Sequence, residues 1–144
     1  MGHPKAKWIL AILRIAPLDR IHIMKALFLF QRRVGEIPDY FHFEPYLYGP
    51  CSFEVYKVLA TLEDDGIIIR PLHPMPQWVE YYLTRRGKKE ADRAVNDIAP
   101  DLLQRLEEIT KEVSQLGFYE LLRRVYEEAP DFAMNSILRG VLRQ

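Results

Sequence analysis

The sequence predicts a mainly α-helical fold of the α+β class with one small β-hairpin. Three observations predict it. Apolar residues recur at helical spacing in several separate segments. A β-branched run and an alternating run flank a proline-rich loop, which is typical of a hairpin. The 144 residues, 49% of them apolar and 12% aromatic, are enough for one hydrophobic core.

Two helices are expected at the start of the chain. The residues from Trp8 to Leu13 are apolar, which predicts a buried helix over Lys5 to Ala16 that Pro17 ends. Asp19 is a typical N-cap residue. A second helix should therefore begin after Asp19 and run to about Arg33.

An aromatic segment and a third helix follow. Tyr40 to Tyr48 is rich in aromatic residues, which favours a strand or an extended arm. Ser52 can cap a helix that Gly66 ends. The apolar positions of this helix follow the i, i+3, i+4, i+7 pattern of an amphipathic helix: Val55, Val58, Leu59 and Leu62.

A hairpin is predicted next. Ile67 to Arg70 and Val79 to Thr84 have the composition of strands, and the loop between them contains three prolines. Three helices followed by such a hairpin are the order of a winged helix-turn-helix domain, which we assign to residues 1–97. Thr84 should begin another helix that ends near Asp97.

Residues 98–144 are expected to form a C-terminal helical extension that packs on the domain or on a second subunit. Asp101 to Leu116 carries a heptad-like apolar seam. Phe118 to Glu128 is a further helix whose apolar face must also be buried, on this chain or on a second copy. We expect a homodimer whose interface is the seam formed by Leu102, Leu106, Ile109, Val113 and Leu116.

Four strings give the chain a resemblance to a known group: PLDRIHIMKALFLFQ, EPYLYGPCSFEVYKVLATLEDDGII, YYLTRRGKKEA and LLRRVYEEAPDFAMNSIL. The sequence resembles small prokaryotic winged-helix proteins that include the YwgA-type proteins and the Panacea domain of SocA-type antitoxins. The most specific signature is Tyr48-Gly49-Pro50-Cys51-Ser52, which predicts a tight turn into a capped helix. The resemblance implies a winged helix with helical additions and a regulatory or partner-binding role.

The first functional hypothesis is a transcription-regulator-like protein that binds double-stranded DNA. In a winged helix the third helix enters the major groove, and basic groups contact phosphates. Here Ser52 to Asp65 carry a net charge of −3, whereas Met1 to Arg33 carry +6 and Arg85 to Glu90 carry +3. The alternative interpretation is that the basic side chains are solvated at helix ends or, for Lys25, along an ordinary surface. The candidate DNA-binding residues are Lys25, Arg32, Arg33, Glu54, Lys57, Thr61, Arg85, Arg86 and Lys88.

The second hypothesis is an antitoxin-like or adaptor-like module that binds a partner protein and not DNA. The acidic third helix and the aromatic segment motivate it, because exposed aromatic clusters mark interfaces. The alternative is that these rings pack on the domain's own helices. The rings concerned are Tyr40, Phe41, Phe43, Tyr46 and Tyr48.

The sequence carries no motif for catalysis. The histidines and Cys51 share no metal-ligand spacing, and the chain has no glycine-rich phosphate loop, paired-carboxylate spacing or nucleophile elbow. We therefore expect no enzyme, no catalytic residues, no metal and no cofactor. Cys51 is either a reactive thiol at a helix N-terminus or a small residue in a turn. A single cysteine and the lack of an apolar run of about 20 residues predict a cytoplasmic protein without a membrane segment.

Overall fold

The computed structural model describes residues 3–35, 37 and 40–133, which form a mainly helical structure with two small antiparallel hairpins. The elements follow one another as α1 (Ala6–Ile15), α2 (Arg20–Val34), β1 (Glu44–Tyr46), β2 (Gly49–Cys51), α3 (Phe53–Asp64), β3 (Ile68–Ile69), η1 (Pro76–Trp78), β4 (Tyr82–Leu83), α4 (Arg85–Ala94), η2 (Val95–Asp97), α5 (Pro100–Ser114), α6 (Phe118–Glu128) and η3 (Pro130–Ala133). The predicted α+β class is confirmed at this level.

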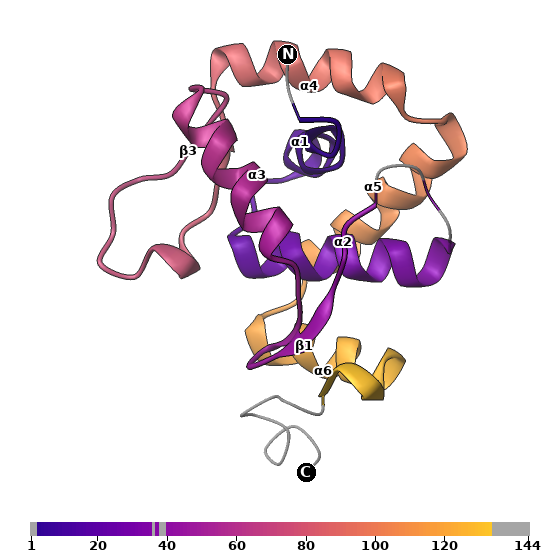
Figure 1. Ribbon diagram of the computed structural model, residues 1–144. Helices are drawn as coiled ribbons and strands as arrows, with labels where there is room; N and C mark the ends of the chain where they lie inside the picture. Colours follow the sequence, from indigo (N-terminus) through magenta and orange to yellow (C-terminus); the bar gives the residue numbers. More distant parts are fainter. Residues whose placement is uncertain (1–2, 36, 38–39, 134–144) are drawn as a thin grey trace.

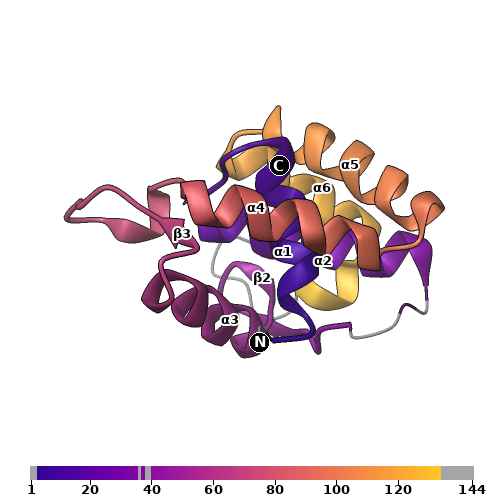
Figure 2. The same ribbon diagram turned by 90° about the horizontal axis from the view of Figure 1, so that it is seen from above.

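α1 forms the centre of the core. It is buried on nearly every face, as its continuous apolar run predicts. In Figure 1, which looks along α1, helix α4 lies above it and α2 below it, while α3 lies to the left. Figure 2 shows α4 crossing over α1, with α5 alongside. The rings of Trp8 and Phe30 meet at 5.5 Å between centroids, which joins α1 to α2 in this core.

The start of α2 is tied to the end of α5 through His22. Asp19 caps α2 as predicted, because its carboxylate accepts the backbone N–H of His22 at 2.8 Å. The His22 ring also contacts Asp19 at 3.0 Å through Nδ1 and the carbonyl oxygen of Leu116 at 2.7 Å through Nε2. Burial opposes protonation of His22, but the hydrogen bonds to Asp19 and Leu116 together raise the pKa of the ring.

The predicted hairpin after the third helix is present but short. Ile68 pairs with Leu83 and Ile69 with Tyr82, and the long loop between the strands projects from the body in Figures 1 and 2. Thr84 caps α4, since its hydroxyl accepts the N–H of Gly87 at 3.0 Å. A Cβ at Gly87 would overlap the carbonyl oxygen of Ile67, so α4 starts directly against the backbone of β3.

The aromatic segment forms half of a second hairpin that the sequence did not predict. β1 pairs with β2 in the register Glu44 to Cys51 and Tyr46 to Gly49. Gly49 has φ +89°, and a Cβ there would lie 2.9 Å from the ring of Tyr126. The turn lies at Leu47 and Tyr48, and β2 separates it from α3. Ser52 occupies the predicted N-cap position of α3, but its buried hydroxyl makes no capping hydrogen bond and has no partner among the described residues.

The heptad-like seam is buried inside one chain, so its assignment as a dimer interface is wrong. Leu106, Ile109 and Val113 are at most 3% exposed, because α5 packs on α1 and α2. Leu102 and Leu116 are half-buried against the same core. An intramolecular helix pair satisfies the same spacing that a coiled coil requires. The apolar face of α6 is also buried on this chain.

Within the described part of the chain, none of the helices has the length and apolar character that crossing a bilayer would require.

Candidate functional site

Lys25 is buried in the core, which corrects its assignment both as a phosphate contact and as a surface lysine. Its residue exposure is 4%, and its ammonium donates a hydrogen bond of 3.1 Å to the carbonyl oxygen of Pro50 in β2. Every residue from Ile23 to Phe30 is buried with it. An ammonium held there cannot reach the backbone of a nucleic acid.

Arg33 is another predicted phosphate contact that the structure places in an internal ion-pair cluster. Its guanidinium donates two hydrogen bonds of 2.9 Å to Glu112 and bonds of 2.8 and 2.6 Å to Glu128. The hydrogen bonds to Glu128 and Glu112 raise the pKa of Arg33, and Arg33 in turn lowers the pKa of Glu112. The cluster joins α2, α5 and α6, so assigning Arg33 to DNA is wrong. The exposed Arg32 pairs with Asp131 at 3.1 Å.

The predicted contacts on α3 form a polar strip of mixed charge, in which Lys57 and Thr61 are exposed and Glu54 is half-buried. Glu54 forms an ion pair with Lys5, which lowers the pKa of Glu54, although burial acts in the opposite direction. The hydroxyl of Thr61 donates to the carbonyl oxygen of Lys57 at 3.0 Å, a bond within the helix itself. Lys57 is exposed. Glu54 therefore already has a partner, which weakens its role as a reader of bases.

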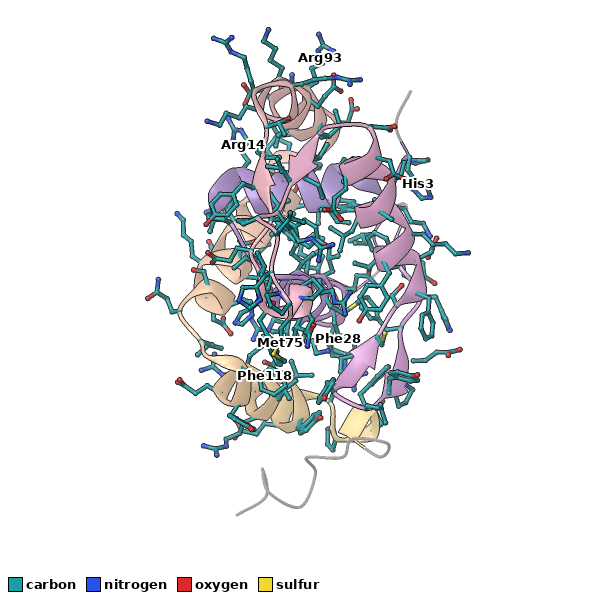
Figure 3. The ribbon with its side chains drawn as sticks, turned by 90° about the vertical axis from the view of Figure 1, so that its left-hand side faces the viewer. His3, Arg14, Phe28, Met75, Arg93 and Phe118 are labelled. Atoms are coloured by element: carbon teal, nitrogen blue, oxygen red, sulfur yellow. The ribbon has the colours of Figure 1, made fainter. Side chains whose placement is uncertain are left out.

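The basic residues at the start of α4 remain on the surface. Arg85, Arg86 and Lys88 are exposed, and Arg86 donates to the carbonyl oxygen of Asp65 at 2.8 Å. Neither Arg85 nor Lys88 makes an ion pair with any residue that the structure describes. Figure 3 shows basic side chains gathered at this end of the molecule, around the labelled Arg93.

The feature that the sequence did not predict is a cavity of about 310 Å³ above Lys25. Its floor is formed by α2, and its walls are the β1–β2 hairpin, α3 and the turn η1 in the loop between β3 and β4. The lining residues are Arg20, Ile21, Met24, Lys25, Tyr46, Leu47, Tyr48, Gly49, Cys51, Tyr56, Gln77 and Trp78. Three separate stretches of the sequence therefore build one site: α2, the β1–β2 hairpin with α3, and η1.

The cavity is positively charged. Two cations, Arg20 and Lys25, line it, and no aspartate or glutamate does. The guanidinium of Arg20 lies 5.3 Å from the centre of the Tyr56 ring and makes no ion pair within the described residues. Burial lowers the pKa of Lys25 to about 8, and the nearby Cys51 and Asp19 oppose only part of this shift. At neutral pH the lysine is still mostly protonated.

Two further titratable groups of the cavity, Tyr56 and Cys51, are neutral at physiological pH. Burial raises the pKa of Tyr56 to about 12, and it also raises the pKa of the Cys51 thiol. Cys51 is buried in β2, and α3 begins two residues later. The thiol is therefore protonated, which favours the interpretation of Cys51 as a structural residue over that of a reactive nucleophile.

Three rings that line the cavity, those of Tyr46, Tyr48 and Trp78, are partly exposed and contact further rings beside it, and we call the whole group the aromatic face. Tyr46 contacts Phe53 at 5.7 Å between ring centroids, and Tyr48 and Trp78 contact Phe118 at 5.6 and 5.0 Å. In Figure 3 the loop carrying Met75 lies near the end of α6 that carries Phe118, in agreement with these contacts. The face consists of Tyr46, Tyr48, Phe53, Trp78, Phe118 and Tyr119, most of them about half exposed.

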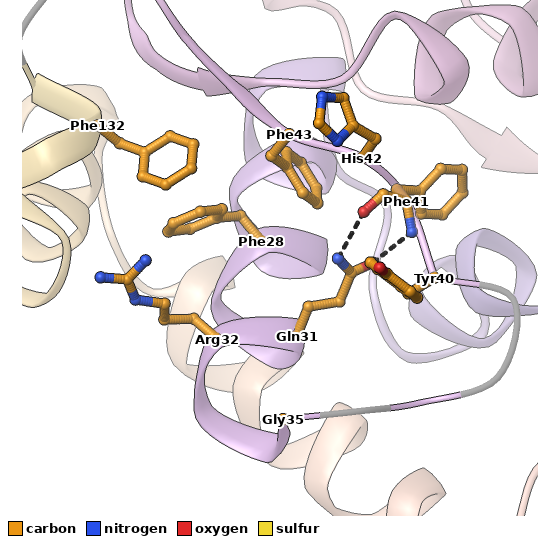
Figure 4. Close-up of a pocket in the computed structure, with 9 residues that line it drawn as sticks. All are labelled: Phe28, Gln31, Arg32, Gly35, Tyr40, Phe41, His42, Phe43 and Phe132. Atoms are coloured by element: carbon orange, nitrogen blue, oxygen red, sulfur yellow. Dashed lines mark hydrogen bonds between the residues drawn. The ribbon is translucent and has the colours of Figure 1, made fainter.

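A second cavity, of about 330 Å³, lies at the other end of α2 and is shown in Figure 4. Gln31 fixes one wall, because its amide accepts the N–H of Phe41 at 2.7 Å and donates to the Phe41 carbonyl at 2.8 Å. Phe28, Phe43 and Phe132 form an edge-to-face stack beside it. This cavity is mainly apolar, and its cation, Arg32, is already paired with Asp131.

The chain matches no protein-family model, no curated protein and no solved structure. No group of three or more histidine, cysteine, aspartate or glutamate side chains in the described ranges could hold a metal ion.

The burial of Lys25 predicts an unusual effect of pH on stability. Removing the charge in Lys25→Met should raise the free energy of unfolding at pH 7 by about 1–3 kcal/mol, because the variant no longer buries an ammonium without a carboxylate. Between about pH 8 and 10.5 the unfolded wild type binds more protons at this residue than the folded one, so wild-type stability rises relative to the variant. Urea unfolding at several pH values should show the advantage of Lys25→Met shrinking across this range.

The matched control is Lys57→Met, which removes an exposed lysine of α3 and changes the net charge equally. If Lys25→Met destabilised the protein at pH 7 by as much as a buried apolar truncation does, the picture of a costly buried charge would be wrong.

Proposed function

We propose that this protein is a partner-binding module on a winged-helix scaffold, and that it binds another protein through the aromatic face. The winged helix is supported by the order of the elements: α1, α2 and α3 precede the β3–β4 hairpin, whose loop corresponds to the wing. The observation that carries the proposal is the set of exposed rings around the cavity. Phe53 and Tyr119 are more than half exposed, and large exposed apolar side chains that lie together mark interaction sites.

The composition of this face favours an interface over an ordinary surface. Tyrosine, tryptophan and phenylalanine supply most of the energetic anchors at protein interfaces because they bury large areas at low entropic cost. The neighbouring loop adds Leu72, which is fully exposed, and Met75. Loss of water from these side chains would stabilise a complex by about 25 cal/mol for each Å² of apolar surface buried.

A different protein fits this face better than a second copy of the chain. A two-fold symmetric pair would bring the same surface of both copies together. The cationic cavities, each with Arg20 and Lys25 and no lining carboxylate, would then face each other. The complementary partner presents apolar side chains to the rings and an acidic group to Arg20, which has no ion pair with the described residues.

Selection from a random peptide library on the immobilised full chain tests the proposal. The enriched peptides should combine apolar and acidic residues. Their affinity should fall about tenfold or more for Phe53→Ser and Tyr46→Ser, because each substitution removes a ring of the face.

Tyr82→Ser is the control, since Tyr82 is similarly exposed but lies in β4, outside the aromatic face. Peptides that bind Phe53→Ser and Tyr46→Ser as tightly as the wild type would contradict the proposal. So would a selection in which no sequence is enriched.

DNA binding is a second candidate, and the exposed basic residues of α4 favour it. Arg85, Lys88 and Lys89 make no ion pair within the described residues, so they are available to phosphates. The charge of α3 acts against it, because Ser52 to Asp65 carry a net charge of −3. The structure also removes Lys25 and Arg33 from the basic surface.

A fluorescence-anisotropy titration with mixed-sequence duplex DNA decides this second candidate. A DNA-binding protein should bind at about 50 mM salt, lose affinity steeply with added salt, and weaken when Arg85, Lys88 and Lys89 are all changed to glutamine. We expect no such binding if the aromatic face is the functional surface. Salt-sensitive binding that the triple variant abolishes would reverse the order of the two candidates.

A further inference from the structure

The cavity above Lys25 combines a buried cation with an open apolar chamber. The ammonium has three N–H donors, and the structure gives it one acceptor, the carbonyl oxygen of Pro50 at 3.1 Å. Arg20 adds a second cation to the same lining. Lys25 is the buried member of this pair, and it lacks the acidic partner that buried cations ordinarily have.

Lys25 lowers the stability of the folded chain compared with an apolar residue at the same position. A leucine or methionine on this face of α2 would fill the space without desolvating a charge. The neighbouring positions Met24 and Ala26 are apolar and buried, so the helix does not need a lysine there. Residues that break the local rules of packing are most often found at functional sites.

The walls of the cavity suit a planar group. Tyr46, Tyr48, Tyr56 and Trp78 line it, and the Arg20 guanidinium already lies over the Tyr56 ring. Aromatic rings bind one another through offset or edge-to-face contacts. The volume of about 310 Å³ is at the small end of the range for ligand sites, roughly 300 to 1,000 Å³.

We infer that this cavity is a binding site for a small aromatic carboxylic acid, whose carboxylate pairs with Lys25 and Arg20 and whose ring lies among Tyr46, Tyr48 and Trp78. The carboxylate supplies the acceptors that Lys25 lacks. The ring replaces water against the aromatic walls. The acid and the proposed partner would share Arg20 and the rings of Tyr46, Tyr48 and Trp78. The two proposals are nevertheless tested apart, because a benzoate titration needs no partner protein.

An aromatic acid fits the cavity better than an inorganic anion does. Two cations of α2 can neutralise a carboxylate, while most of the remaining lining consists of aromatic rings and aliphatic groups. Phosphate has no apolar part, so it would pair with the two cations but would make no ring contact with the aromatic walls. A neutral amide of the same shape would leave Lys25 without a counter-charge.

Isothermal titration calorimetry on the full chain with benzoate tests the inference, with benzamide and inorganic phosphate as comparison probes. Benzoate should bind with a dissociation constant in or below the millimolar range and bind at least tenfold more tightly than either comparison probe. Its affinity should fall as the pH is raised above about 8, because Lys25 then loses its proton. Lys25→Met should abolish benzoate binding, while Lys57→Met should leave it unchanged.

Each other result overturns the inference. Lack of benzoate binding to the wild type, equal binding of benzamide, or undiminished binding to Lys25→Met would each do so. N-acetylphenylalanine is the probe for a chain terminus as the natural ligand. Binding of N-acetylphenylalanine without binding of benzoate would assign the cavity to a partner's carboxyl terminus and not to a free acid. Thermal unfolding of Lys25→Met shows that a loss of binding does not come from a loss of fold.

Discussion

The buried charge of Lys25 is the constraint on which the organisation of this end of the molecule depends. α2 carries the lysine into the core, and β2 supports it through the Pro50 carbonyl. The β1–β2 hairpin must therefore fold back over α2, which Gly49 permits by its positive φ and its close approach to Tyr126. The same hairpin then presents Tyr46 and Tyr48 around the cavity. The site and the local fold thus have one common cause.

Internal ion pairs determine which charges remain for partners. Arg33 joins α2 to α5 and α6 through Glu112 and Glu128, and Lys5 joins the start of α1 to Glu54 of α3. These contacts fix helices that are distant in sequence, and they remove several basic groups from the surface. Among the described residues, the basic side chains without an ion pair include Arg85, Lys88 and Lys89 on α4 and Arg20 and Lys25 in the cavity, besides single exposed residues on α3, α5 and α6. This distribution favours a local, mainly aromatic contact over an extended contact with a polyanion.

The sequence predicted the helices well because their signals are local. Asp19 and Thr84 cap the helices that they were expected to begin, and the β3–β4 hairpin has the predicted position. The β1–β2 pair was missed because Pro50 lies within β2, and proline is unfavourable in strands. The apolar spacing of α5 allows packing either on a helix of the same chain or on a helix of another chain.

The burial of Lys25 could have been predicted from the sequence. All residues from Ile23 to Phe30 except Lys25 are apolar, and a helix that is apolar on all sides is buried. The cavity itself depends on three separate stretches of the sequence, which no local pattern brings together.

The most direct test of the account is the titration of Lys25 itself, followed by NMR on protein with isotope-labelled lysine side chains. Lys25→Met assigns the signal by its absence. For a buried Lys25 ammonium, the midpoint of its titration should lie at about pH 8 and should move to higher pH when an aromatic acid is bound. A midpoint at the ordinary lysine value of about 10.4 would show that the ammonium is solvated, and would contradict both the buried charge and the site built on it.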